Sequence, residues 1–125
     1  MRHSVLIGLA VATLAASPAL GQSATTLDEF VTRANRIPLN ATAMLRPDAH
    51  RLKAEAERSI SAVVAEIRQA RAAGRAPVAC PPDRISMNPR QFLGFFNSIP
   101  AARRQRMSVT DGARAWFADR YPCQT

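Results

Sequence analysis

The hydrophobic residues of this chain recur at steps of three and four positions, the spacing that places side chains on one face of an α-helix. No segment alternates polar and apolar residues as a half-buried strand does. The chain also contains no internal repeat and no low-complexity tract. The pattern therefore predicts an all-α fold, a small bundle of about four helices.

The first predicted helix starts with a capping box, in which Thr26 and Glu29 each satisfy a free backbone amide of the first turn. It should end before Pro38, because proline restricts the residue that precedes it. Its apolar stripe consists of Leu27, Phe30, Val31 and Ala34. The following segment, Ala41 to Leu45, fits either a turn of helix or a loop.

The second predicted helix is the longest and runs from Pro47 or Asp48 to Ala73. Gly74 stands where a left-handed cap is expected. One face is apolar and should lie in the core, whereas the charged residues fall largely elsewhere. The apolar positions are Leu52, Ala56, Ile60, Val63, Val64 and Ile67.

Asn88 and Pro89 open the third predicted helix, with asparagine as the cap and proline at the first helical position. Its apolar side is formed by Phe92, Leu93, Phe95, Phe96 and Ile99. Phenylalanines this close together favour a core position over a ligand-stacking surface. The segment Ala101 to Met107 is interpreted as one further helical turn.

The last predicted helix begins at a second capping box, between Ser108 and Asp111, and stops at Tyr121-Pro122. Cys123 therefore lies just past the helix end. There it can tie this helix back to the proline-rich connection around Cys80.

The first 21 residues have the features of a secretory signal peptide. A short basic start, Met1-Arg2-His3, precedes the apolar run Val5 to Ala16, and small residues lead to a predicted cleavage after Gly21. Twelve apolar residues are too few for a permanent membrane span, so no stable membrane insertion is expected. The predicted organisation is a signal peptide, 1–21, and a single helical domain, 22–125, in a periplasmic or secreted protein.

Export changes the interpretation of the two cysteines. An even number of cysteines in an oxidising compartment favours a disulfide between Cys80 and Cys123, and two free thiols are the alternative. The bond would close a loop of 43 residues. In the chain-entropy model such a loop contributes about 4 kcal/mol, which is comparable with the whole stability of a small domain.

The chain has 17 basic and 9 acidic residues, for a net charge of +8 that falls to +7 when Arg2 leaves with the signal peptide. Outside the cytoplasm this charge favours anionic protein, peptidoglycan or lipid surfaces, and no nucleic-acid partner is expected. The cluster of Arg103, Arg104 and Arg106 is either a solvated cationic edge or an anchor for a negatively charged partner. These arginines are weak candidates for partner binding.

The residues give no indication of catalysis. His50 is the only histidine after the predicted cleavage site, and no nucleophile motif accompanies it. Glu55 and Glu57 are two positions apart and do not face each other on a helix. The cysteines and acids lack metal-ligand spacing, and there is no glycine-rich phosphate loop. We therefore expect a binding protein that is not an enzyme, with no catalytic residues, no metal and no cofactor.

The C-terminal half resembles the Tai-type (Rap-type) immunity proteins over roughly Val78 to Cys123. The resemblance rests on Cys80-Pro81-Pro82, an amphipathic helix, Ile99-Pro100 followed by arginines, another helix, and Tyr121-Pro122-Cys123. Those proteins are small, helical, periplasmic and disulfide-containing, and they neutralise peptidoglycan amidase effectors delivered by type VI secretion. The resemblance implies a protein that binds and occludes such an amidase.

Two other classes remain open. A periplasmic chaperone-like protein is also small, helical and singly disulfide-bonded, although few acids and one histidine argue against a strong acid switch. A cell-envelope structural or ligand-binding module would use the cationic face. The sequence leaves a homodimer open.

Overall fold

In the computed structural model, which describes residues 25–124, the chain is all-α. Its elements are α1 (Leu27–Asn35), the 3₁₀-helix η1 (Ala41–Leu45), α2 (Pro47–Ala72), α3 (Pro89–Ser98), α4 (Ala101–Arg104) and α5 (Val109–Arg120). The prediction of an all-α bundle of about four helices is confirmed, because α4 adds only one 4-residue turn. The predicted signal peptide, 1–21, lies outside the described residues.

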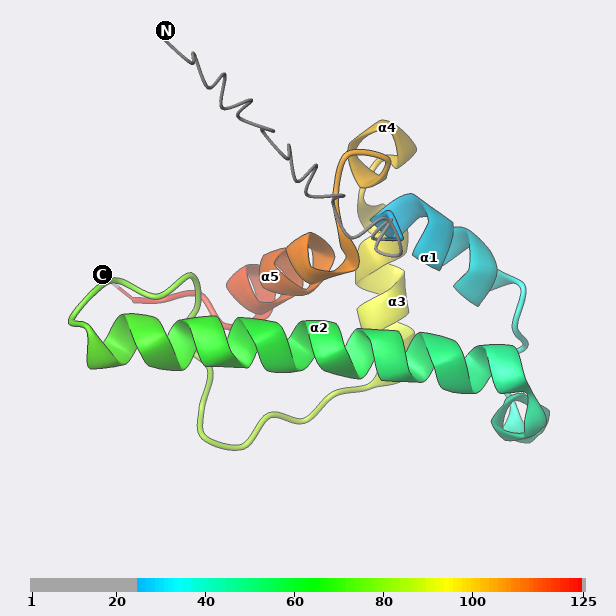
Figure 1. The fold of residues 1–125 in the computed structure, drawn as a ribbon, viewed down its shortest axis with the longest axis horizontal. Coiled ribbons are helices and arrows are strands. Elements are labelled where there is room, and N and C mark those ends of the chain that lie inside the picture. Colours follow the sequence, from blue (N-terminus) through cyan, green and yellow to red (C-terminus); the bar gives the residue numbers. More distant parts are fainter. Residues whose placement is uncertain (1–24, 125) are drawn as a thin grey trace, which may run out of the picture.

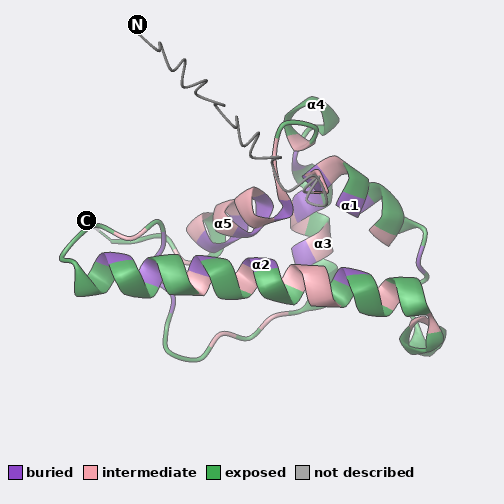
Figure 2. Ribbon diagram, in the orientation of Figure 1, coloured by how far each residue is buried: buried purple, intermediate pink, exposed green. Residues whose placement is uncertain are grey.

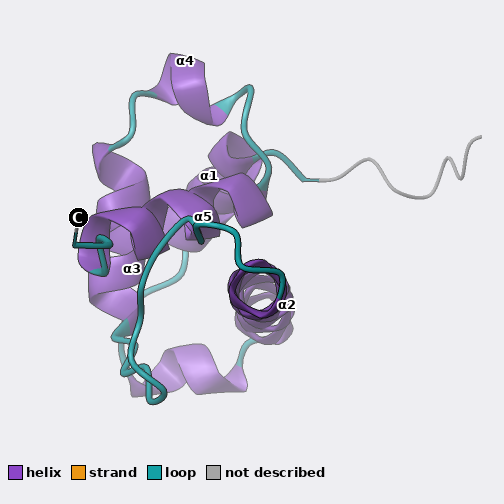
Figure 3. Cartoon of the chain, turned by 90° about the vertical axis from the view of Figure 1, so that its left-hand side faces the viewer, coloured by secondary structure: helices purple, strands orange, loops and turns teal. Residues whose placement is uncertain are grey.

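The long helix α2 lies along one side of the molecule, beside α1, α3 and α5 (Figure 1). A view along α2 places α1, α3 and α5 to one side of it (Figure 3). The faces that these helices turn toward one another are buried, whereas much of the opposite face of α2 is exposed (Figure 2). The fold is therefore one long helix covered on one side only.

The helix ends follow the capping signals of the sequence. Thr26 and Ser108 each form a complete capping box, with Glu29 and Asp111 respectively. Gly74 has a φ of 69° just after α2, which ends at Ala72, one residue before the predicted end. The segment between α1 and α2, for which helix and loop were both possible, is the 3₁₀-helix η1.

The core is built around aromatic side chains that pack together from three helices, α1, α3 and α5. The ring of Phe92 lies 4.4 Å from Phe96 and 5.4 Å from Trp116, centroid to centroid. Phe30 of α1 meets Phe96 edge-on at 6.0 Å. Phe96 is completely buried and Phe92 is 5% exposed, so the expectation that the phenylalanines of α3 belong mainly to the core is confirmed.

The closest approach in the core occurs at Gly112 of α5. A Cβ atom at this position would lie 2.8 Å from Cδ1 of Leu27 and 3.0 Å from Cε1 of Phe96. The backbone amide of Leu27 donates to the carbonyl of Met107, at 2.8 Å, immediately before α5. The missing side chain thus lets α5 pack directly against α1 and α3.

A charged clamp fixes α5 against α2. The guanidinium of Arg114 binds Glu66 of α2 through two hydrogen bonds, of 2.7 and 3.0 Å, and Asp111 through a third, of 2.8 Å. The Arg114 hydrogen bonds lower the pKa of Glu66, and the Ser108 amide, with Arg114, lowers the pKa of Asp111. Both carboxylates therefore stay ionised at neutral pH.

The α2 residue of this clamp, Glu66, lies in the second half of that helix. At about 1.5 Å per residue, α2 with 26 residues is about 39 Å long and α5 with 12 residues is about 18 Å. Ser59 is buried and lies 3.4 Å from the hydroxyl of Thr110 at the start of α5. Because α5 begins beside Ser59, most of the first half of α2 extends beyond the N-terminal end of α5.

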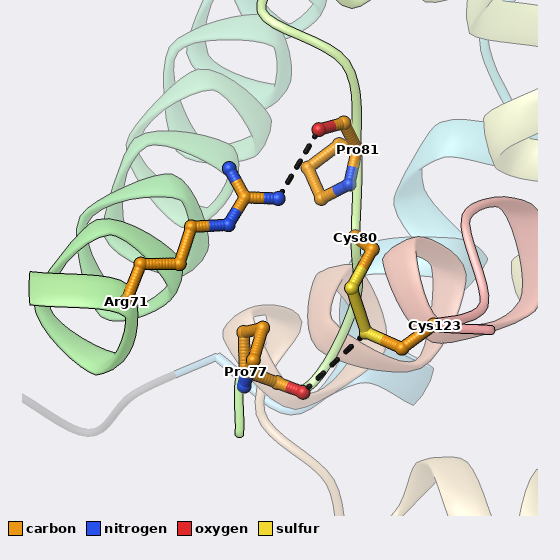
Figure 4. Close-up of a disulfide and its surroundings, with 5 residues drawn as sticks. All are labelled: Arg71, Pro77, Cys80, Pro81 and Cys123. Atoms are coloured by element: carbon orange, nitrogen blue, oxygen red, sulfur yellow. Dashed lines mark hydrogen bonds between the residues drawn. A yellow bond between two sulfur atoms is a disulfide. The ribbon is translucent and has the colours of Figure 1, made fainter. Parts of the chain in front are cut away.

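The predicted disulfide between Cys80 and Cys123 is present, with the two Cα atoms 4.9 Å apart (Figure 4). It joins the proline-rich connection to the chain just after α5, and the amide of Cys80 also donates to the carbonyl of Tyr121 at 2.8 Å. Arg71 of α2 donates to the carbonyl of Pro81 at 3.3 Å. The sulfur of Cys123 lies 3.8 Å from the carbonyl oxygen of Pro77, a contact only, since an oxidised sulfur carries no proton.

The packing at Gly112 predicts opposite effects for the same substitution in two helices. Gly112→Ala should destabilise the protein by about 1 kcal/mol, because overpacking costs more than the gain in helix propensity. Gly94→Ala should stabilise it by about 0.5 kcal/mol, because nothing lies within 4 Å of the added methyl group. Urea unfolding followed by circular dichroism measures both, and a stabilising Gly112→Ala would contradict the packing described here.

Candidate binding groove

The half of α2 that α5 leaves uncovered forms one wall of an open apolar groove of about 500 Å³. We call this feature the groove. Leu52, Ala56 and Ile60 of α2 form its first wall, and Phe30 of α1 and Phe92 of α3 contribute to the others. Lys53 and Glu57 are the only charged residues in the lining. The groove is therefore an apolar space whose charged groups lie at its margin.

The groove is hollow because many of its lining positions carry small side chains. Ala34 of α1, Ala43 of η1, and Ala49 and Ala56 of α2 stand where larger residues would fill the space. Alanine satisfies the apolar pattern of a core-facing stripe without occupying its volume. The sequence pattern alone places Ala34 and Ala56 in core-facing stripes and does not indicate the groove.

One rim of the groove exposes large hydrophobic side chains, which we call the hydrophobic edge: Leu39, Met44 and Leu45. Their exposed fractions are 47%, 63% and 84% respectively, and Leu39 also lines the groove. Single exposed apolar residues are ordinary, but a cluster beside an apolar groove is typical of an interaction site. This edge falls in the segment between α1 and α2 that the sequence left undecided.

The hydrophobic edge is held in place by hydrogen bonds to its backbone. The Asn40 side chain accepts from the amide of Thr42 at 3.0 Å and so caps η1. The Nε2 atom of His50 lies 2.7 Å from the Met44 carbonyl, and Arg90 of α3 donates to the Leu39 carbonyl at 2.9 Å. His50 is exposed and supports η1, which is a structural role.

At the margin of the groove, more basic than acidic side chains lack an ion-pair partner among the described residues. The carboxylates of Asp48, Glu55 and Glu57 pair with Arg46, Arg33 and Lys53, at 2.8, 3.7 and 3.5 Å. Hydrogen bonding between Arg46 and Asp48 raises the pKa of the arginine and lowers that of the aspartate.

Further arginines beside the groove have no carboxylate partner within the part of the chain that the structure describes. Arg36 and Arg84 are exposed and directly precede the lining residues Ile37 and Ile85, and Arg90 reaches the lining through the Leu39 carbonyl. Asp83, which precedes Arg84, is an exposed acid in the same segment and forms no ion pair with a described residue. The surroundings of the groove are therefore cationic.

The arginine cluster after α3 separates into two kinds of residue. Arg104 is mostly buried: it forms an ion pair with Asp28 of α1, at 3.0 Å, and its Nη1 donates to the Ile99 carbonyl at 3.0 Å. Arg103 and Arg106 are exposed, and Arg106 donates to the Ala102 carbonyl at 3.4 Å. Arg104 thus links α4 to α1 and to the end of α3, and a partner role for the other two stays a prediction.

The groove offers burial of apolar surface and no grouping of reactive side chains. Among residues 25–124, no three histidine, cysteine, aspartate or glutamate side chains are placed to hold a metal ion. Across the same residues, no helix has both the length and the apolar character needed to cross a bilayer. The described lining of the groove therefore consists almost entirely of apolar contact surface.

Comparison of the chain with family models, with curated proteins and with solved structures finds no match in any of the three. The resemblance to Tai-type immunity proteins accordingly stays a prediction from the residues that carry it.

The two kinds of arginine predict different responses to the same substitution. Arg104→Gln should lower the free energy of unfolding by about 2 kcal/mol, because it removes charge-assisted bonds in a mostly buried setting. Arg103→Gln removes the same charge from an exposed residue and should change stability by less than about 0.5 kcal/mol. Equal losses in urea unfolding would contradict the structural role of Arg104.

Proposed function

We propose that this chain is an exported, non-enzymatic binding protein that contacts a protein partner through its hydrophobic edge. The observation that carries the proposal is the high exposure of Met44 and Leu45 on a turn whose backbone is fixed. A rigid turn loses little conformational entropy on binding, so the burial of these side chains contributes more of its free energy to affinity. The disulfide suits an oxidising compartment such as the periplasm or the extracellular space.

The class of partner comes from the resemblance of the C-terminal half to Tai-type immunity proteins. By that resemblance, the partner is a peptidoglycan amidase delivered by type VI secretion, which this chain would bind and occlude. Arg103 and Arg106, which are exposed, remain weak candidates for contacts with acidic residues at the margin of such an interface.

A chaperone-like role is the second candidate, and the apolar groove is the observation that favours it. An open groove with an almost wholly apolar lining can hold apolar segments of many unfolded chains. A chaperone would bind different proteins without fixed stoichiometry, whereas an immunity protein binds one enzyme tightly. A structural role in the cell envelope is compatible with the cationic surface, and its binding should weaken as salt is added.

The experiment uses the oxidised chain from Gln22 as bait in envelope and secreted extracts, with mass spectrometry of the retained proteins. The expected result is a single cell-wall amidase at 1:1 stoichiometry, whose hydrolysis of peptidoglycan stops when one equivalent of this protein is added. The variant Met44→Asp/Leu45→Asp should weaken retention at least about 100-fold, since two apolar anchors become charged.

Val78→Asp is the matched control, because Val78 is also an exposed hydrophobic residue but lies beyond the other end of α2. It should retain the amidase as the unchanged protein does. Retention of many unfolded proteins, with no inhibition of an amidase, would overturn the immunity proposal and favour the chaperone. Equal loss in both variants would show that the hydrophobic edge is not the contact.

A further inference from the structure

We propose that the groove binds a single-chain amphiphile with an anionic headgroup, such as a fatty acid or a monoacyl lipid anion. This binding site is separate from the contact proposed for the hydrophobic edge and does not depend on it. The chain of the ligand would lie along the apolar walls, and its headgroup would remain at the cationic margin.

The volume and lining of the groove match the apolar part of such a ligand. Sites for small molecules commonly enclose about 300–1,000 Å³, and the groove, at about 500 Å³, falls within this range. Leu52, Ile60, Phe92 and Leu93 supply aliphatic and aromatic surface from two helices. The lining offers few polar groups to a ligand, so recognition along the walls depends on shape and apolar contact.

The distribution of charge selects the headgroup. The acids in the first half of α2 are each paired with a cation, whereas Arg90 of α3 has no acidic partner among the described residues. Arg90 donates to the carbonyl of the lining residue Leu39, so its guanidinium lies at the margin itself. A carboxylate or phosphate at this margin would be attracted, and a quaternary ammonium would be repelled.

The walls are already in place for a ligand. Asn35 of α1 and Asn97 of α3 exchange side-chain hydrogen bonds of 2.9 and 3.2 Å, which fixes these two helices to each other. Phe30 and Phe96 join the same helices in the core. Binding therefore requires no reorganisation of the helices.

The first test is calorimetric titration of the oxidised chain from Gln22 with dodecanoate and with dodecyltrimethylammonium, each below its critical micelle concentration. These probes have opposite headgroup charges, and the alkyl chain of dodecanoate is one CH₂ group shorter, which alone would favour the ammonium. Dodecanoate should bind at 1:1 stoichiometry and at least about 10-fold more tightly, with the difference shrinking as salt is added. Equal affinity would overturn the headgroup assignment, and no binding of either would overturn the site.

Chain length distinguishes the groove from nonspecific adsorption. From octanoate to decanoate to dodecanoate, affinity should rise about fourfold per added CH₂ group, the factor that corresponds to about 0.8 kcal/mol per buried CH₂. The single tryptophan, Trp116, stacks at 5.4 Å on the lining residue Phe92 and should report occupancy by fluorescence. An affinity independent of chain length would contradict the proposal.

Paired substitutions locate the site. Ala56→Phe adds a ring inside the groove and should weaken dodecanoate binding at least about 10-fold, whereas Ala65→Phe, on an exposed position of the same helix, should not. Arg90→Gln should weaken the binding of dodecanoate about threefold or more, and it should leave the binding of dodecyltrimethylammonium unchanged or make it tighter. Arg103→Gln makes the same charge change on α4 and is the control. Equal effects within either pair would overturn the location, and circular dichroism confirms that each variant is folded.

Discussion

The attachment of a short helix, α5, to one half of a much longer helix, α2, is the constraint on which the rest of this structure depends. The Arg114 clamp and the contact between Ser59 and Thr110 hold the two helices together. The disulfide adds a covalent tie from the end of α5 to the connection that follows α2. Because α5 is less than half as long as α2, the apolar stripe of α2 continues beyond its partner.

The groove and its hydrophobic edge follow from that mismatch in length. Helices α1 and α3 approach the uncovered half of α2, but alanines on the facing surfaces leave the space between them unfilled. Burying apolar surface stabilises a small domain, so a fold with an unfilled space of this kind is less stable than one in which larger side chains fill it. Such a loss is typical of a surface kept for binding, and it supports the proposal that this chain is a binding protein.

Much of the fold was predictable because its determinants are local. The capping boxes at Thr26 and Ser108, the proline after Asn88 and the glycine after α2 each act within one turn, and each helix appears where they place it. The disulfide followed from compartment and cysteine count. These signals do not depend on how the helices are arranged in space.

The candidate site was not predictable in the same way, because it depends on tertiary packing. The sequence pattern is the same for an alanine that packs against a neighbouring side chain and for an alanine that borders a cavity. The burial of Arg104 likewise depends on Asp28, 76 residues earlier in the chain, so the sequence grouped it with its exposed neighbours. Met44 and Leu45 lay in a segment whose structure the pattern left open, and only their exposure in the fold marks them.

The most direct test of this account is the rate at which a thiol placed on α2 reacts with a maleimide while the native disulfide is intact. Ala56→Cys places the thiol in the groove, and Val63→Cys places it on the completely buried face in the half of α2 beside α5. We expect the thiol at position 56 to react at least about 100-fold faster than the thiol at position 63. The maleimide can reach position 63 only after the protein unfolds around it. Similar protection at both positions would mean that α2 is covered along its whole length and that the groove does not exist.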